Sequence, residues 1–162
     1  MENKNYTKVI SAGIIIVRQT KEGPRFLLLY RTRGVWDFPR GRMEADEKSW
    51  QTAFREVSEE TGLKRSDLDI QQNFKVYEKF PYSRGKERIF KIVIFYLAKT
   101  EKSEVKISAE HEGYGWFSYN EARRMLSRYK ARVAILKKAL FYIKGINPTH
   151  AEKTTSFAQQ SS

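Results

Sequence analysis

The sequence predicts an α+β fold in which a mixed β-sheet lies between helices. Apolar segments of strand length alternate along the chain with two longer segments of helical periodicity, which is typical of a sheet covered by helices. The chain has 162 residues, a length that suits one domain with a single hydrophobic core. Hydrophobic residues make up 40% of the chain and aromatic residues 14%, which is enough for a globular fold.

The first predicted elements form a hairpin. Residues 9–17 (VISAGIIIV) are apolar and rich in Ile, which indicates a buried strand. Gly23 and Pro24 predict a turn, and residues 26–30 (FLLLY) predict the second strand. Residues 34–41 are expected to form a loop.

A helix is predicted over residues 48–61. Its apolar side chains recur at i, i+3, i+4 and i+7 and so form one stripe, made of Trp50, Ala53, Phe54 and Val57. The residues between them are good helix formers. Gly62 stands where a left-handed C-terminal cap is expected. We therefore expect the stripe to face the core.

The second half of the chain is expected to add three strands. They are predicted over residues 74–80, 89–98 and 114–117, with a turn over residues 81–87 and a charged connector over residues 101–112.

A second helical region is predicted after the last strand. It is capped at Ser118 or Asn120, broken near residues 128–130, and ended by Gly145 and Pro148.

Composition narrows the class of protein. One domain is expected over residues 6–145, and residues 146–162 are expected to form a disordered polar tail. Without cysteine the chain cannot form a disulfide or a thiolate zinc site. The polar residues 1–8 lack the apolar segment of a signal peptide, and no apolar run is long enough to span a membrane. These features predict a cytoplasmic protein with no membrane association.

The chain is strongly basic. It has 31 Lys plus Arg against 19 Asp plus Glu, a formal net charge of +12. This balance favours polyanionic partners such as nucleotides or RNA, and it fits a solubility charge scattered over the surface equally well. The second helical region contains a group of seven basic residues: Arg123, Arg124, Arg128, Lys130, Arg132, Lys137 and Lys138. They are interpreted as its solvated face, and a patch that binds nucleic acid or an acidic partner is the alternative.

Three glutamates on the first helix indicate a functional site. Glu56, Glu59 and Glu60 share a helix face that lies away from the centre of the apolar stripe. Like charges at this spacing destabilise a helix by roughly 0.2–0.5 kcal/mol per pair, and the helix dipole disfavours acids in the last turn by about 0.3–1 kcal/mol each. A divalent cation such as Mg²⁺ would offset this repulsion, because it binds carboxylates together with substrate phosphates. A solvated acidic face paired with Arg55 and Lys64 is the alternative.

The segment over residues 41–63 (GRMEADEKSWQTAFREVSEETGL) resembles the Nudix box, G-x5-E-x7-R-E-U-x-E-E-x-G-U, in which U is bulky and aliphatic. Every fixed position is filled, by Gly41, Glu47, Arg55, Glu56, Val57, Glu59, Glu60, Gly62 and Leu63. A chance match is on the order of one in 10⁹ per starting position. The resemblance implies the Nudix fold, an α/β/α sandwich with a mixed β-sheet, and an enzyme that cleaves a diphosphate linkage with Mg²⁺ or Mn²⁺.

The resemblance also implies a role for each box residue. Those that resemble the catalytic metal ligands are Glu56, Glu59 and Glu60. Arg55 resembles the residue that orients a box glutamate, and Glu47 would brace the junction of loop and helix or add an outer contact to the metal. The glycines that would allow the backbone turns are Gly41 and Gly62.

The expected chemistry follows from charge. A metal neutralises the diphosphate oxygens and lowers the pKa of a bound water, and a carboxylate takes the proton from the attacking water. Arg40 or Arg42 is expected to bind substrate and to stabilise the developing charge, with plain solvent exposure as the alternative for both.

Outside the box, residues 11–122 resemble the asymmetric diadenosine tetraphosphate hydrolases of the animal and archaeal type. The match includes SAGIIIV, WDFPRGRMEADE and ISAEHEGYGWFSYNEA. By this resemblance Glu110 would complete the metal cluster or act as the general base, and Glu112 is its local competitor. His111 is expected to belong to the loop rather than to the substrate site.

The resemblance also implies an aromatic side chain that stacks on adenine. Tyr77 and Tyr82 are the candidates, and such a contact contributes about 1–3 kcal/mol per base. The segment over residues 76–88 is longer than its counterpart in the family, so the adenine-binding residue stays open between them.

The preferred reaction is therefore hydrolysis of diadenosine tetraphosphate to ATP and AMP. The first alternative is an RNA 5′-end pyrophosphohydrolase or decapping-type enzyme, in which several cations would follow the RNA backbone: Arg31, Arg33, Arg40, Arg42, Arg84, Lys86 and Arg88. The second is a non-catalytic Nudix-fold binding module, which the intact set of box glutamates disfavours.

Overall fold

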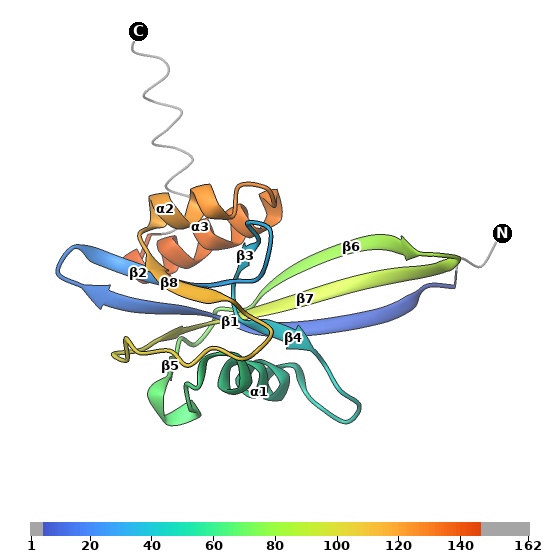
Figure 1. Ribbon diagram of the computed structural model, residues 1–162, viewed down its shortest axis with the longest axis horizontal. Helices are drawn as coiled ribbons and strands as arrows, with labels where there is room; N and C mark the ends of the chain where they lie inside the picture. Colours follow the sequence, from blue (N-terminus) through green and yellow to red (C-terminus); the bar gives the residue numbers. More distant parts are fainter. Residues whose placement is uncertain (1–4, 147–162) are drawn as a thin grey trace, which may run out of the picture.

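A mixed sheet of eight strands forms the middle layer of the computed structural model, which describes residues 5–146 (Figure 1). The strands are β1 Thr7–Thr20, β2 Gly23–Tyr30, β3 Trp36–Asp37, β4 Arg40–Arg42, β5 Asp69–Ile70, β6 Val76–Arg84, β7 Glu87–Lys99 and β8 Gly113–Phe117. Their order is β3-β2-β1-β7-β5, while β4 pairs with β1, β6 with β7 and β8 with β2.

The parallel pair of β1 and β7 makes the sheet mixed, as predicted. The two strands align from Thr7 against Ile89 to Val17 against Lys99, and every other pairing is antiparallel. Their middle segments are apolar at almost every position, because the sheet is covered on both faces there.

Helices cover both faces of the sheet. Helix α1 (Ser49–Thr61) lies on one face, while α2 (Tyr119–Met125) and α3 (Lys130–Lys144) lie on the other (Figure 1). A short 3₁₀ turn, η1 (Arg65–Asp67), follows α1. Side chains of β1 alternate between the two layers: those toward α1 include Ile14 and Ile16, and those toward α3 include Ile15 and Val17. The predicted α/β/α sandwich is thus confirmed.

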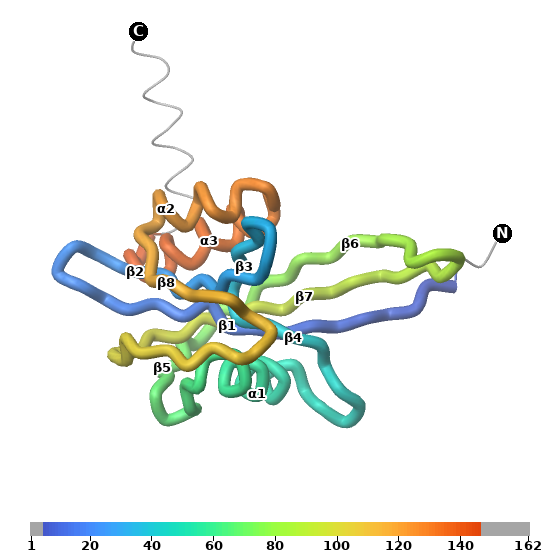
Figure 2. The backbone as a smooth tube through the Cα atoms, viewed as in Figure 1, coloured from blue at the N-terminus to red at the C-terminus, as the bar shows by residue number. Residues whose placement is uncertain are grey.

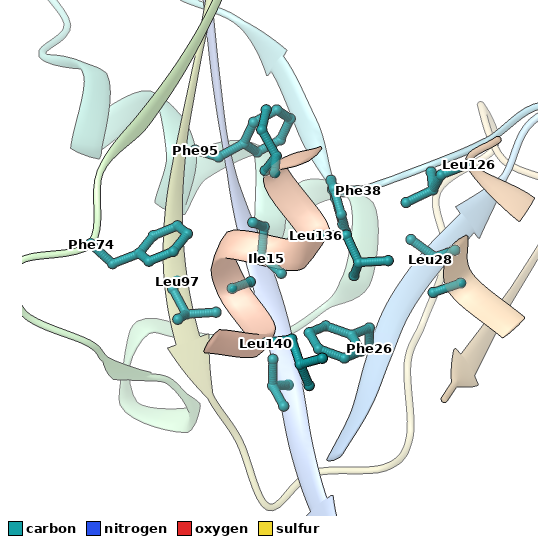
Figure 3. Packing of buried hydrophobic residues seen from close by; sticks show 14 of the residues in the cluster. Ile15, Phe26, Leu28, Phe38, Phe74, Phe95, Leu97, Leu126, Leu136 and Leu140 are labelled. Atoms are coloured by element: carbon teal, nitrogen blue, oxygen red, sulfur yellow. The ribbon is translucent and has the colours of Figure 1, made fainter. Parts of the chain in front are cut away.

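Two apolar cores result, one on each side of the sheet. In the core under α3, Leu136 and Leu140 of the helix face Ile15 and Leu97 of the strands (Figure 3). The second core joins α1 to the opposite face of the same strands, through Ala53 and Val57 among others. No helix within residues 5–146 is long and apolar enough to cross a membrane.

Part of the sheet extends well beyond the helices as a three-stranded arm (Figure 2). We define the arm as residues 7–10 of β1, 79–84 of β6 and 87–92 of β7. Its outer strand, β6, is exposed over most of its length. One face of the arm continues the wall of a charged pocket, because Lys91 of β7 lines that pocket.

The helix boundaries largely follow the prediction. Helix α1 ends at Gly62, which has a φ of 73° and donates its backbone N–H to the Ser58 carbonyl. Ser118 caps α2 by accepting the Glu121 N–H, and the predicted break separates α2 from α3. Gly145, with a φ of 65°, ends α3. Pro148 and most of the predicted tail lie outside the described residues.

Four local predictions are wrong. Trp50 belongs to the apolar stripe of α1 that was expected to face the core, but it is 40% exposed at the start of the helix. Gly23 and Pro24 belong to β2, and the turn is formed by the two residues before them, because Thr20 pairs directly with Gly23. Residues 34–41 contain β3 and the start of β4 rather than a plain loop. Residues 81–84 continue strand β6, which can include Pro81 because its outer edge has no partner strand within the described part of the chain.

Candidate active site

A pocket of about 580 Å³ brings together most of the predicted site residues. It is lined by carboxylates from α1 and from the connector before β8, and by cations from β4, β7 and the segment after β2. The lining side chains with charge are Glu56, Glu59, Glu60, Glu110, Arg31, Arg40, Arg42 and Lys91. Glu110 lines the pocket and its competitor Glu112 does not. Arg31 and Lys91 were not among the residues predicted for the site, although Arg31 was named for the RNA alternative.

Arg55 links the box glutamates to one another. Its guanidinium donates to Glu47 at 2.6 Å, to Glu56 at 2.9 Å and to Glu59 at 3.3 Å. It also donates to the Arg42 carbonyl at 3.0 Å, which ties β4 to the helix. Arg55 therefore contacts three of the box glutamates at once.

Glu47, in the loop before α1, accepts hydrogen bonds from Arg55, from Thr52 and from the backbone N–H of Glu44. Besides Arg55, the hydroxyl of Thr52 donates to its carboxylate at 2.6 Å. The hydrogen bond from Arg55, followed by that from Thr52, lowers the pKa of Glu47 from 4.5 to about 2. Glu47 does not line the pocket and braces the helix start instead.

Gly41 allows β4 to lie directly against α1. A Cβ atom at this position would come within 1.9 Å of the Glu56 carboxyl carbon, so any larger residue would displace this carboxylate. Next to it, the Arg40 N–H donates to Glu60 at 3.1 Å. Strand β4 thus binds the Glu60 carboxylate through its backbone and lies directly against the carboxylate of Glu56.

The carboxylates of the pocket repel one another. Glu60 is only 4% exposed, and burial, followed by the negative charge of Glu56, raises its pKa to about 8. Burial also raises the pKa of Glu56, against the opposing effect of Arg55. Within residues 5–146, no three acidic or histidine side chains converge into a preformed metal cage. All four carboxylates nevertheless offer the oxygen ligands that Mg²⁺ prefers, and Mg²⁺ usually keeps several waters and substrate oxygens. The donor set therefore fits such a cation.

The cations of the same pocket are also crowded. Burial lowers the pKa of Lys91, and the positive charges of Arg40 and Arg42 lower it further. A polyphosphate would relieve this repulsion by contributing oxygens to all three groups. One pocket thus contains crowded acids and crowded cations, and a complex of a divalent metal with a polyphosphate complements both sets.

A buried ion-pair network positions Arg40. One Asp37 carboxylate oxygen accepts from Arg40 Nε at 2.8 Å, and the other accepts from Arg132 Nε at 2.8 Å. Burial would raise the pKa of Asp37, but the charges of Arg132 and Arg40 lower it below its usual value. Arg132 also forms an ion pair with Glu78 of β6. Its predicted place on the solvated basic face is wrong, because it is 6% exposed and lies on the core side of α3.

The two candidate tyrosines lie on opposite faces of β6. Tyr77 pairs with Ile94, whose side chain faces the α1 layer. Phe80 pairs with Lys91, and Tyr82 with the next residue on the same face, Ile89. Tyr82 therefore shares the face of the pocket cation Lys91, and Tyr77 does not.

Phe80 and Tyr82 form an exposed aromatic pair on the arm. Their ring centroids are 6.1 Å apart, and the residues are 37% and 38% exposed. Phe80 was missed because residues 74–80 read as an ordinary strand, in which an aromatic is expected to be buried.

His111 belongs to the loop beside the pocket, as expected. It is 9% exposed, and its Nδ1 lies 3.3 Å from the Ser108 hydroxyl. Burial, together with the charge of Arg31, lowers its pKa. It does not line the main pocket.

Comparison with known proteins identifies relatives over most of the chain. A model of the NUDIX domain matches residues 7–138. The asymmetrical bis(5′-nucleosyl)-tetraphosphatase of Sus scrofa is 34% identical over 138 residues, which cover 79% of this chain and 90% of that protein. An RNA pyrophosphohydrolase of Hydrogenovibrio crunogenus is 29% identical over 123 residues, which cover 67% of this chain and 73% of that protein. A binary complex of C. elegans Ap4A hydrolase superposes with a TM-score of 0.74 at 28% identity, over 85% of this chain and 99% of that one.

Proposed function

The chain belongs to the NUDIX family and is a pyrophosphohydrolase, and from that premise we propose that it cleaves diadenosine tetraphosphate asymmetrically to ATP and AMP. The observation that carries the proposal is the pocket in which four carboxylates and four cations meet. The name of the Sus scrofa relative supports the choice of substrate.

The proposed cofactor is Mg²⁺, with Mn²⁺ as a substitute. Glu56, Glu59, Glu60 and Glu110 would hold it, because they supply the oxygen ligands on the pocket wall. When bound, the metal would neutralise phosphate oxygens and lower the pKa of a coordinated water. Arg55 keeps the carboxylates of Glu56 and Glu59 in place through its hydrogen bonds.

The remaining steps fall to protein side chains. A pocket carboxylate, either Glu110 or a box glutamate, accepts the proton of the attacking water. Arg40, Arg42 and Lys91 neutralise the phosphate oxygens and the charge that develops on the leaving phosphate. Asp37 fixes the direction of Arg40, so this cation need not be reoriented during the reaction.

The arm is proposed to hold one nucleoside of the substrate. Phosphates at Lys91 would place the attached base over the neighbouring strand β6, where Phe80 and Tyr82 are exposed on the same face. An adenine can stack on either ring, since aromatic side chains accept the flat face of any base. Tyr77 has no part in this proposal because of its place on the other face.

A substrate panel tests the proposed reaction. Purified protein would be given diadenosine tetraphosphate, nucleoside triphosphates, ADP-ribose and 5′-triphosphorylated RNA, each with and without Mg²⁺, and the products would be separated by chromatography. We expect metal-dependent ATP and AMP in equal amounts from the dinucleotide, formed faster than any other product. Two ADP molecules per substrate, or faster turnover of another substrate, would contradict the proposal.

A second candidate function is removal of pyrophosphate from RNA 5′ ends. It is favoured by the similarity to an RNA pyrophosphohydrolase and by the basic tip of the arm, which carries Arg84, Lys86 and Arg88. The same panel separates the two candidates, because the RNA would then be the faster substrate.

A further inference from the structure

The surface of α2 and α3 carries more than half of the net charge of the chain. Residues 119–146 contain eight basic residues and one acidic residue, a net charge of +7 out of +12. Seven of the basic residues are exposed: Arg123, Arg124, Arg128, Lys130, Lys137, Lys138 and Lys144. Among the residues that the structure describes, none of these seven forms an ion pair. Within the described residues these seven charges are therefore not neutralised by acidic side chains, whereas that of Arg132 is.

Three of these cations surround a groove of about 360 Å³ between the two helices. Arg123 and Arg124 contribute from α2 and Lys130 from the start of α3, and the lining is completed by Ser127 and Val133. No acidic side chain lines this groove. The one acid of the two helices, Glu121, lies at the start of α2, where its carboxylate accepts from the Ser118 hydroxyl at 3.0 Å.

The groove also has apolar surface, and an exposed aromatic residue directly precedes its Lys130 in the chain. Val133 is half-buried and lies in its lining, and Tyr129, next to Lys130, is 44% exposed. A small anion would meet only one or two of the cations, whereas a phosphate chain can meet several in succession. An exposed ring among cations suits unpaired bases, which offer their flat faces for stacking.

We propose that this α2–α3 surface is a binding site for single-stranded nucleic acid, separate from the active site. None of the five residues that line the groove also lines the active-site pocket. The proposal therefore does not depend on which nucleotide the active site cleaves. It implies that the protein can hold a polynucleotide while the catalytic pocket is free to turn over a small substrate.

The test compares two triple variants of the full chain. In the first, Arg123, Arg124 and Lys130 are replaced by alanine. The second variant is the control and replaces three exposed lysines elsewhere in the chain by alanine: Lys21, Lys99 and Lys102. None of the three forms an ion pair in the described structure. Binding of a fluorescein-labelled 20-nucleotide oligouridylate is measured by anisotropy without divalent metal at several salt concentrations, and hydrolysis of diadenosine tetraphosphate is measured in parallel.

For the wild type we expect binding that weakens with salt, because each phosphate contact releases about 0.7 counterions from a single strand. The groove variant should bind at least about tenfold more weakly at low salt, and its log–log salt slope should be smaller by about 2. The control variant should keep the wild-type affinity to within about threefold. All three proteins should hydrolyse the dinucleotide at similar rates, which shows that the active site is intact.

Several outcomes would overturn the proposal. The first is that the wild type does not bind oligouridylate at low salt, and the second is that the groove variant binds it with full affinity. An equal loss of affinity in the groove and control variants would show that only the net charge matters. The surface would be assigned to membranes instead if the protein bound vesicles containing phosphatidylserine through the same three residues and did not bind the oligonucleotide.

Discussion

At the scale of single residues, the ion pair of Glu47 and Arg55 holds the box loop against its helix. The 2.6 Å contact between them and the hydrogen bond from Thr52 bridge the loop and the first turns of α1. These contacts favour the charged form of Glu47 and lower its pKa from 4.5 to about 2. The carboxylate therefore contributes stability that is present above pH 4.5 and is lost as the pH falls through about 2.

Replacement of Glu47 by glutamine should lower stability at neutral pH and change its pH dependence. Glu47→Gln should unfold at a lower urea concentration than the wild type at pH 7. The difference should shrink as the pH falls below 4.5, because the carboxyl of the unfolded wild type then takes up a proton, whereas the native carboxyl stays charged until about pH 2. Urea midpoints at pH 7, 4 and 3 measure this.

The matched control for Glu47 is Glu101, an exposed acid without an ion pair in the described structure. Glu101→Gln should leave the midpoint nearly unchanged at each pH. A Glu47→Gln midpoint that stays below the wild-type value by a constant amount from pH 7 to pH 3 would contradict the account of this ion pair.

The box residues could be predicted from sequence, because their roles depend on spacing within one helix and its flanking turns. Arg132 could not be predicted in the same way. Its partners Asp37 and Glu78 lie 95 and 54 positions earlier, so only the tertiary fold brings them together. A local signal did exist, since Arg132 stands at i, i+3, i+4 and i+7 with the buried Ile135, Leu136 and Ala139.

At the scale of elements, the pairing of β6 with β7 decides which aromatic residues share a face with the pocket cation Lys91. Tyr77 and Tyr82 are five positions apart, so in one continuous strand they must point to opposite faces. The sequence prediction ended the strand at Phe80 and placed Tyr82 in a turn, which hid this difference. The pairing of β6 with β7 resolves it, because Phe80 lies opposite Lys91.

Single alanine variants test the role of the arm. Tyr82→Ala should raise the KM for diadenosine tetraphosphate roughly tenfold or more with little change in kcat, since base stacking contributes about 1–3 kcal/mol. Tyr77→Ala is the control, because Tyr77 is 49% exposed on the opposite face. Steady-state kinetics of both variants give the answer. A KM that rises in Tyr77→Ala and not in Tyr82→Ala would contradict this role of Tyr82. It would place the base on the opposite face of β6.

Most elements were predicted with the right type and nearly the right limits. The strands of the central sheet and α1 have strong periodicity and clear caps, so local signals were sufficient. The wrong element limits concern segments whose structure depends on pairing with another strand rather than on the local sequence. Strands β3 and β4 are two and three residues long and exist only because they pair with β2 and β1. Register of this kind is set by tertiary contacts and could not be derived from one sequence.

At the scale of the whole molecule, the sandwich assembles one pocket from distant parts of the chain. The box helix supplies carboxylates from one layer, strands β4 and β7 supply cations from the middle layer, and the connector before β8 adds Glu110. Helix α3 contributes indirectly, since its Arg132 holds Asp37 and thereby Arg40. We propose that this pocket performs metal-dependent hydrolysis of a diphosphate linkage.

The most direct test of that claim is the Mg²⁺-dependent hydrolysis rate of Glu59→Gln beside that of Glu112→Gln. The Glu59 side chain is 58% exposed and lines the pocket, whereas Glu112 is an exposed acid that does not line it. Glu59→Gln should lose at least about 100-fold in kcat on diadenosine tetraphosphate, the scale of losing a key electrostatic contact, with an unchanged urea midpoint. Glu112→Gln should keep the wild-type rate. A near-normal rate in Glu59→Gln would contradict the assignment of this pocket as the metal-dependent active site.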